Sequence, residues 1–71
     1  MYIHAPEGTI VTPHFENGQL QGGYESEKHR AMKYLESGKT YTVLYTEANS
    51  WNTDVYLKEF PGIPFNIVHF K

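Results

Sequence analysis

The sequence contains no cysteine, and this absence removes several ways in which a small chain is stabilised or made reactive. Disulfides, thiolate zinc sites and cysteine nucleophiles are all excluded. A chain of 71 residues has a small core, because a domain of this size buries only about 60% of the surface of its unfolded form. We therefore expect one domain, stabilised mainly by apolar packing.

An excess of charge of one sign is also absent. The chain has six basic and eight acidic residues, a net charge of −2, and its lysines and arginine are scattered. Proteins that bind nucleic acid usually gather basic residues on one surface. The chain begins with neither a basic segment nor an apolar stretch long enough for a signal peptide or a membrane span. We therefore expect a cytoplasmic protein without a membrane partner, and we find little electrostatic support for DNA or RNA binding.

Recognisable catalytic and metal-binding motifs are lacking as well. The histidines, His4, His14, His29 and His69, show no metal-ligand spacing, and we interpret them as surface or edge residues. The serines lie in capping and turn contexts, and Gly22-Gly23 lacks the lysine and hydroxyl residue of a phosphate-binding loop. We expect no catalytic residue, no metal ligand and no cofactor, and hence no enzyme.

What the sequence does have is many aromatic residues, with one tryptophan, six tyrosines and four phenylalanines, and clear turn signals. These rings fill a small core efficiently. We predict one domain over residues 1–71, with an N-terminal β segment and hairpin over 1–25, a helix over 26–37 and a three-stranded meander over 39–71.

A hairpin is predicted around Asn17-Gly18, the dipeptide favoured in type I′ turns. Pro13 indicates an edge strand, and Gly22-Gly23 ends or bends the returning strand. The register that the turn predicts pairs Phe15 with Leu20 and Glu16 with Gln19.

A short helix is predicted from Ser26, a suitable N-cap, to Glu36, with Gly38 in the position of a C-terminal capping glycine. Its apolar residues are Ala31, Met32 and Leu35. A helix this short is marginal alone, so we expect this stripe to pack on the sheet.

The rest of the chain alternates between apolar and polar residues, as half-buried strands do. In the segment 40–47, we expect Tyr41, Val43 and Tyr45 on one side and Thr42, Leu44 and Thr46 on the other. In the segment 53–60, we expect Val55 and Leu57 inside and Asp54, Tyr56 and Lys58 outside. A turn over 61–64 then leads to a last strand over 65–70, and the residues expected to be buried are Tyr41, Val43, Val55, Leu57 and Phe70. This pattern favours a small β-barrel or sandwich.

Three segments resemble a recurrent class of small phage and prophage proteins. They are Leu35-Glu36-Ser37-Gly38-Lys39-Thr40-Tyr41-Thr42-Val43, Val55-Tyr56-Leu57-Lys58-Glu59-Phe60-Pro61-Gly62 and Phe65-Asn66-Ile67-Val68-His69-Phe70. The resemblance implies a mostly β protein, a small SH3-like β-barrel with an N-terminal hairpin and one short α-helix. It implies no catalytic residues and leaves the residues before Leu35 outside the pattern.

A candidate contact surface is the outward side of the two central strands. Tyr56, Lys58, Asp54 and Thr42 would form an amphipathic patch there. Trp51, in the loop between the strands, suits an interface anchor because it buries a large area with few rotatable bonds. The alternative for Trp51 is a lid over one end of the barrel.

These features favour a protein-binding module, of phage type, that acts as an adaptor or as a stoichiometric inhibitor of a host protein or defence complex. One alternative is a nucleic-acid-binding barrel, in which Tyr56, Tyr45 or Trp51 stacks on bases and Lys39, Lys58 and Arg30 contact phosphates. Another is a virion component or homo-oligomer built by edge-strand pairing. If the chain is phage-encoded, we expect it in the host cytoplasm.

Overall fold

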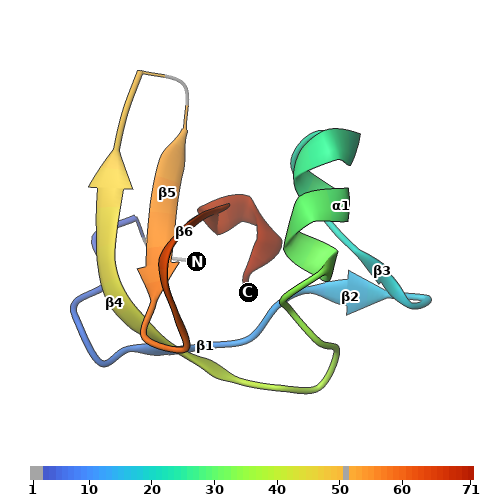
Figure 1. Cartoon of the computed structure of the whole chain (residues 1–71), viewed down its shortest axis with the longest axis horizontal. Coiled ribbons are helices and arrows are strands. Elements are labelled where there is room, and N and C mark those ends of the chain that lie inside the picture. The colour runs from blue at the N-terminus through green and yellow to red at the C-terminus, as the bar shows by residue number, and fades with distance from the viewer. Residues whose placement is uncertain (1–2, 51) are drawn as a thin grey trace.

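The computed structural model describes residues 3–50 and 52–71 as a mostly β protein with two sheets and one short α-helix (Figure 1). Its elements are β1 (Ile10–Val11), β2 (Phe15–Glu16), β3 (Gln19–Leu20), α1 (Glu25–Met32), β4 (Tyr41–Ala48), β5 (Thr53–Leu57), β6 (Phe60–Asn66) and a 3₁₀ helix, η1 (Ile67–His69). The larger sheet has the order β1-β4-β5-β6, and β2 pairs with β3. The β2–β3 hairpin and α1 lie on one side of the molecule and the β4–β5 hairpin on the other.

The core is formed by the inward residues of the β4–β5–β6 meander. Val43 pairs with Leu57 and Val55 pairs with Phe65 across antiparallel strands, and all four are at most 1% exposed. The five residues that alternation places inside are buried, which confirms the prediction: Tyr41, Val43, Val55, Leu57 and Phe70. Leu20, Ala31 and Leu35 join this core from the N-terminal half, so the hairpin and the helix pack on the meander.

A β-bulge in β4 changes the expected side of Tyr45. The register moves from Val43 opposite Leu57 to Tyr45 opposite Tyr56, so two steps along β4 match one step along β5. A bulge inserts one extra residue into one strand and reverses the alternation beyond it. Tyr45 is 48% exposed, so its predicted place beside Tyr41 and Val43 is wrong.

The chain after β5 also differs from the prediction. The turn lies at Lys58-Glu59, between the paired residues Leu57 and Phe60, and the segment 61–64 belongs to β6. Its prolines fit there because β6 is an edge strand of the sheet, where a missing N–H costs no ladder bond. The expected strand over 65–70 ends at Asn66, whose side chain accepts a hydrogen bond from the Val68 amide and begins η1.

The N-terminal hairpin has the predicted register, with Phe15 opposite Leu20 and Glu16 opposite Gln19. Asn17 and Gly18 have φ values of 53° and 76°. Positive φ at both central residues is the requirement of a type I′ turn, so the local sequence determines this pairing.

The helix begins and ends earlier than predicted. Tyr24, not Ser26, is the N-cap residue, and its amide donates to Oε1 of Glu27 at 3.1 Å. The helix ends at Met32 with Lys33 as C-cap, so Gly38 lies well beyond the capping position. No helix in the described part of the chain is long and apolar enough to cross a membrane.

The two edges of the larger sheet are not paired with each other, and the described residues form no closed barrel. An isolated bridge between Pro13 and Phe70 links the C-terminal end to the segment after β1. The His14 amide donates to the His69 carbonyl at 2.7 Å, and the Lys71 amide donates to the Thr12 carbonyl at 2.9 Å. The SH3-like barrel therefore stays a prediction.

Candidate functional site

The outward side of β4 and β5 carries a stacked pair of tyrosines. Tyr45 and Tyr56 are cross-strand partners, and their ring centroids lie 4.5 Å apart with an angle of 15° between the ring planes. Opposite Tyr56 on its other side is Pro64 of β6. We call Tyr45, Tyr56 and Pro64 the tyrosine face. It continues over three strands, so it is a surface of the sheet rather than an isolated ring.

The bulge is what brings the two tyrosines together. Without the register shift after Val43, alternation would direct Tyr45 to the side of Val43, away from Tyr56. The helix borders the other end of the face, because Nη2 of Arg30 donates to the Pro64 carbonyl at 2.9 Å. The face is therefore held by the sheet register and by a contact from α1.

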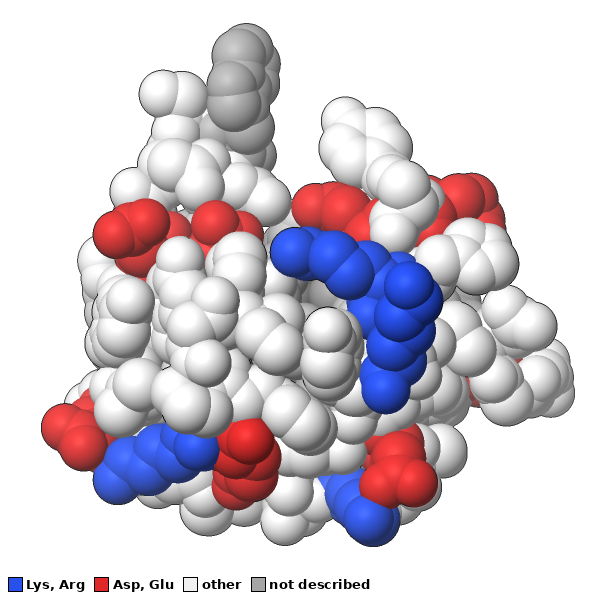
Figure 2. Space-filling view, in the orientation of Figure 1, with Lys and Arg blue, Asp and Glu red and all other residues white. Residues whose placement is uncertain are grey.

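Two acidic residues lie next to the tyrosine face, each two positions from a tyrosine along its strand and closer to the loop between β4 and β5. Glu47 and Asp54 are direct cross-strand partners, and we call them the carboxylate pair. In Figure 2, acidic residues lie near the loop end of these strands and an uncharged surface extends below them. Burial raises the pKa of the Tyr56 phenol above its ordinary value, and nearby Tyr45, Glu47 and Asp54 raise it further.

The predicted contact residues fall into two groups. Tyr56 and Asp54 lie on the same side of β5, with Tyr45 and Glu47 opposite them. Thr42 and Lys58 lie beyond the bulge, where the Lys58 amide donates to the Thr42 carbonyl at 2.9 Å.

Thr42 and Lys58 are also engaged with acidic neighbours. The Thr42 amide donates to Oε1 of Glu59 at 2.9 Å, and Nζ of Lys58 lies 3.3 Å from Oε2 of Glu7. Trp51 lies outside the described residues. The protein-binding patch predicted from the sequence leaves out Tyr45, which is named only as a stacking ring of the nucleic-acid alternative, and Glu47. A regular alternation directs Tyr45 inward, and without the bulge Glu47 would lie opposite Thr53 instead of Asp54.

A second feature is a pocket of about 390 Å³ between the start of α1 and the end of β6. Its lining residues are Gly23, Tyr24, Glu27, Asn52, Asn66 and Val68. The Glu27 carboxylate, which accepts from the Tyr24 amide, also lies 3.5 Å from Nδ2 of Asn66. The polar groups at this pocket thus hold the helix against the C-terminal segment.

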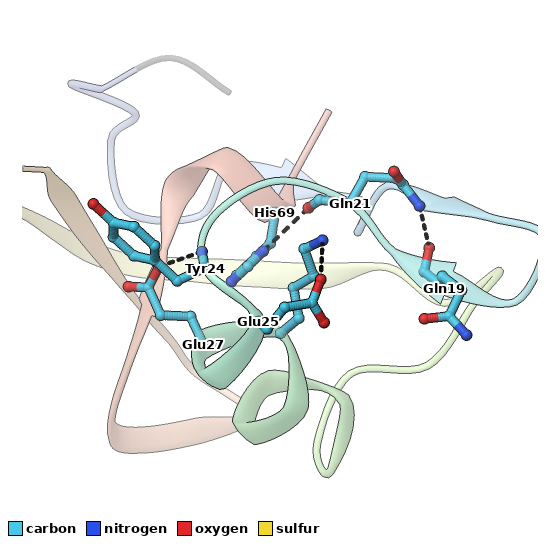
Figure 3. A network of polar contacts seen from close by, with 7 residues as sticks. Gln19, Gln21, Tyr24, Glu25, Glu27 and His69 are labelled. Carbon is cyan, nitrogen blue, oxygen red and sulfur yellow. Dashed lines mark hydrogen bonds and ion pairs between the residues drawn. The ribbon is translucent and has the colours of Figure 1, made fainter.

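The neighbouring polar contacts are structural in the same way (Figure 3). His69 is 1% exposed, and its Nδ1 lies 3.2 Å from the Gln21 carbonyl. The prediction of a surface or edge position is wrong for this histidine, whose ring fills space in the junction. Gly22 has a φ of +86°, and a Cβ on it would lie 2.7 Å from the Val68 carbonyl oxygen. Backbone packing, rather than phosphate binding, therefore explains this glycine.

Within residues 3–50 and 52–71, no three histidine, aspartate or glutamate side chains gather into a group that could hold a metal ion. His14 has its own neighbour, with Nε2 lying 3.1 Å from Oε1 of Glu16 on the exposed hairpin. The candidate contact surface is thus the tyrosine face with its carboxylate pair, where a stacked and partly exposed pair of rings lies beside two acidic residues.

Comparison with known proteins gives one finding. A family model described as bacteriophage T4 protein Y07B matches residues 14–71. The match takes in the hairpin and the helix, which the sequence resemblance leaves out. No curated protein and no solved structure matches the chain.

Proposed function

Because the chain belongs to the bacteriophage T4 protein Y07B family, we propose that it is a phage-encoded protein-binding module without enzymatic activity. It acts in the host cytoplasm, as an adaptor or as a stoichiometric inhibitor of a host protein or defence complex. A small SH3-like barrel is the architecture that we propose for it, and the β4–β5–β6 meander and the Pro13–Phe70 bridge support that proposal.

The observation that carries this proposal is the stacked, partly exposed tyrosine pair on the outward side of the sheet. Tyr45 is 48% exposed although it pairs with another ring, so the pair still offers apolar area to a partner. Tyrosine is enriched at protein interfaces because it combines a large rigid ring with a polar end. Asp54 supplies a polar group beside the pair. Thr42, Lys58 and Trp51 belong to the proposed surface on sequence grounds.

The charges of the described residues favour a protein over a nucleic acid as partner. A strand-binding surface needs cations beside its aromatic rings to contact phosphates. Here the residues that follow the rings on β4 and β5 toward the loop are Glu47 and Asp54. The cation at the border of the face, Arg30, donates to the Pro64 carbonyl. Two of the cations that a nucleic acid would use, Lys39 and Lys58, form ion pairs with Glu36 and Glu7.

The test is capture of partners from lysate of the natural host with wild-type protein and with Tyr56→Ala. We expect a host protein to be enriched by the wild type and lost from the variant. With the purified partner, truncating an aromatic anchor should weaken affinity by about thirtyfold or more. Tyr24→Ala is the matched control, because Tyr24 is 79% exposed but lies at the start of α1, outside the strands that carry the tyrosine face.

Thermal melts of both variants establish that the fold is retained. A folded Tyr56→Ala protein that captures the same host protein with unchanged affinity would place the contact surface elsewhere. Equal losses in Tyr56→Ala and Tyr24→Ala would likewise contradict the proposed surface.

A further inference from the structure

We propose that the partner inserts an arginine side chain between the tyrosine face and the carboxylate pair. This inference rests on the proposed function and names the chemistry of the partner. The guanidinium would stack on the Tyr45–Tyr56 pair and donate hydrogen bonds to the carboxylates of Glu47 and Asp54.

The first reason is that the carboxylate pair has no cation of its own among the described residues. Like charges directly opposite each other on two strands destabilise a sheet. The lysines that form ion pairs in the described part of the chain use other carboxylates: Lys28 with Glu25, Lys39 with Glu36 and Lys58 with Glu7. A cation from a partner would therefore relieve the repulsion between Glu47 and Asp54.

The second reason is the spacing between two rows of side chains, the tyrosine row of Tyr45 and Tyr56 and the carboxylate row of Glu47 and Asp54. On β4, Tyr45 and Glu47 are two residues apart, and Asp54 and Tyr56 have the same spacing on β5. Residues two apart on a strand lie on one side of the sheet about 7 Å from each other. A group between the rows thus meets an aromatic surface on one side and carboxylate oxygens on the other.

Arginine fits this arrangement better than lysine does. Its planar guanidinium stacks on aromatic rings and presents several N–H donors in a fixed fork, which suits carboxylates. The ammonium group of lysine is a compact, strongly hydrated charge that cannot stack in this way.

The partner is a different protein rather than a second copy of this chain. The chain has a single arginine, Arg30, and its Nη2 already donates to the Pro64 carbonyl beside the tyrosine face. A second copy could supply a guanidinium only from Arg30, which in its own chain is already engaged at the edge of the tyrosine face. A nucleic acid would bring phosphates toward the carboxylate pair, which charge repulsion disfavours.

The test uses a defined probe rather than the unknown partner. ¹⁵N-labelled protein is titrated with the acetylated, amidated peptide Gly-Arg-Gly, and with the same peptide carrying citrulline, which keeps the shape of arginine but is neutral. We expect the arginine peptide to shift the amide signals of residues 45, 47, 54 and 56, and the citrulline peptide to leave them in place. The citrulline peptide lacks the charge, and hydrogen bonds between charged groups are stronger than neutral ones.

In the variant Glu47→Gln/Asp54→Asn, the affinity for the arginine peptide should fall by about tenfold or more, because hydrogen bonds to charged groups are stronger than neutral ones. Glu16→Gln/Glu36→Gln is the matched control, since it removes the same charge from residues that neighbour His14 and Lys39 instead. We expect that control to bind like the wild type, and melting curves check that both variants fold.

Several results would overturn the inference. They are equal shifts from the citrulline peptide, no shift of the four amides, and an equal loss in the control variant. Shifts of the same amides on raising the protein concentration alone would indicate a second copy, and shifts with oligothymidine would indicate nucleic acid.

Failure of this inference can be told apart from failure of the proposed function. If Tyr56→Ala abolishes capture of the host protein while the arginine peptide does not bind, the proposed function stands and only the arginine is wrong. If Tyr56→Ala leaves capture unchanged, the proposed function itself fails.

Discussion

The two sides of the β4–β5 pair differ in what their side chains contact. On the inward side, Val43, Val55 and Leu57 are completely buried and contact other apolar residues. On the outward side, Tyr45 stacks on Tyr56 while remaining half exposed, and two carboxylates face each other without a described cation.

The comparison indicates which side is arranged for stability. The inward side follows the rule that apolar side chains pack tightly in an interior from which water is excluded. The outward side retains a like-charged pair in direct register, an arrangement that costs stability and that a substitution of either residue would remove. Residues that oppose folding are commonly retained for binding, so the outward side is the better candidate for function.

The largest expected difference between the two sides appears when two neighbouring residues that point to opposite sides are truncated in turn. Leu57→Ala should lower the free energy of unfolding by about 2 to 5 kcal/mol, because it leaves a cavity in the core. Tyr56→Ala should have a much smaller effect, since an outward ring takes little part in the core. Urea denaturation of both variants measures the difference.

A loss of at least the same size in Tyr56→Ala would contradict the division between the two sides. It would mean that the tyrosine stack, rather than the buried apolar row, stabilises this part of the sheet. Val43→Ala is a second inward control, because Val43 is the cross-strand partner of Leu57.

Much of the inward side could be predicted from the sequence, because alternation is a local property of each strand. Val55 and Leu57 are separated by one polar residue, and that spacing alone directs both to the core. The register of the β2–β3 hairpin was predictable for a similar reason, since Asn17 and Gly18 favour one turn type.

The outward side could not be predicted in the same way. The bulge after Val43 depends on how β4 matches β5, and no pattern within β4 reveals a mismatch with its partner. The proline-containing segment after Phe60 looks like a turn until its position at the sheet edge is known. The helix start depended on Glu27, which caps a helix that begins before Ser26.

A smaller effect should appear when the repulsion between the acidic residues is removed. Glu47→Gln should raise the free energy of unfolding by a few tenths of a kcal/mol to about 1 kcal/mol, the range of cross-strand charge effects. The gain should shrink in about 1 M salt, where charges only a few ångströms apart are already screened. Thermal or urea denaturation at two salt concentrations measures it.

The control for this gain is the same substitution in an Asp54→Asn background. There the opposing charge is already gone, so Glu47→Gln should add nothing. A destabilised Glu47→Gln protein, or a gain that persists in the Asp54→Asn background, would show that the two carboxylates do not repel each other across the strands.

The smallest expected effect is on the titration of Tyr56 itself. Its pKa is raised above the ordinary value of 10.0, first by burial and then by Tyr45, Glu47 and Asp54. In Glu47→Gln the pKa of Tyr56 should fall but stay above 10.0, because burial and the stacked ring remain. The ¹³Cζ shift of each tyrosine, followed from about pH 8 to 12, measures this pKa, and Glu16→Gln serves as a distant charge control.

The sign of the linked stability change follows from the same shift. In the unfolded chain the phenol loses its proton near its ordinary pKa, whereas in the folded chain it holds the proton to higher pH. The contribution of Tyr56 to stability is therefore fully present below pH 10 and is lost as the pH rises through the folded pKa. Tyr56→Phe has no proton to lose at this position, so its stability should fall less steeply above pH 10 than that of the wild type. Identical slopes for the two proteins would mean that folding does not raise the Tyr56 pKa, and an unchanged Tyr56 pKa in Glu47→Gln would mean that the Glu47 carboxylate contributes nothing to it.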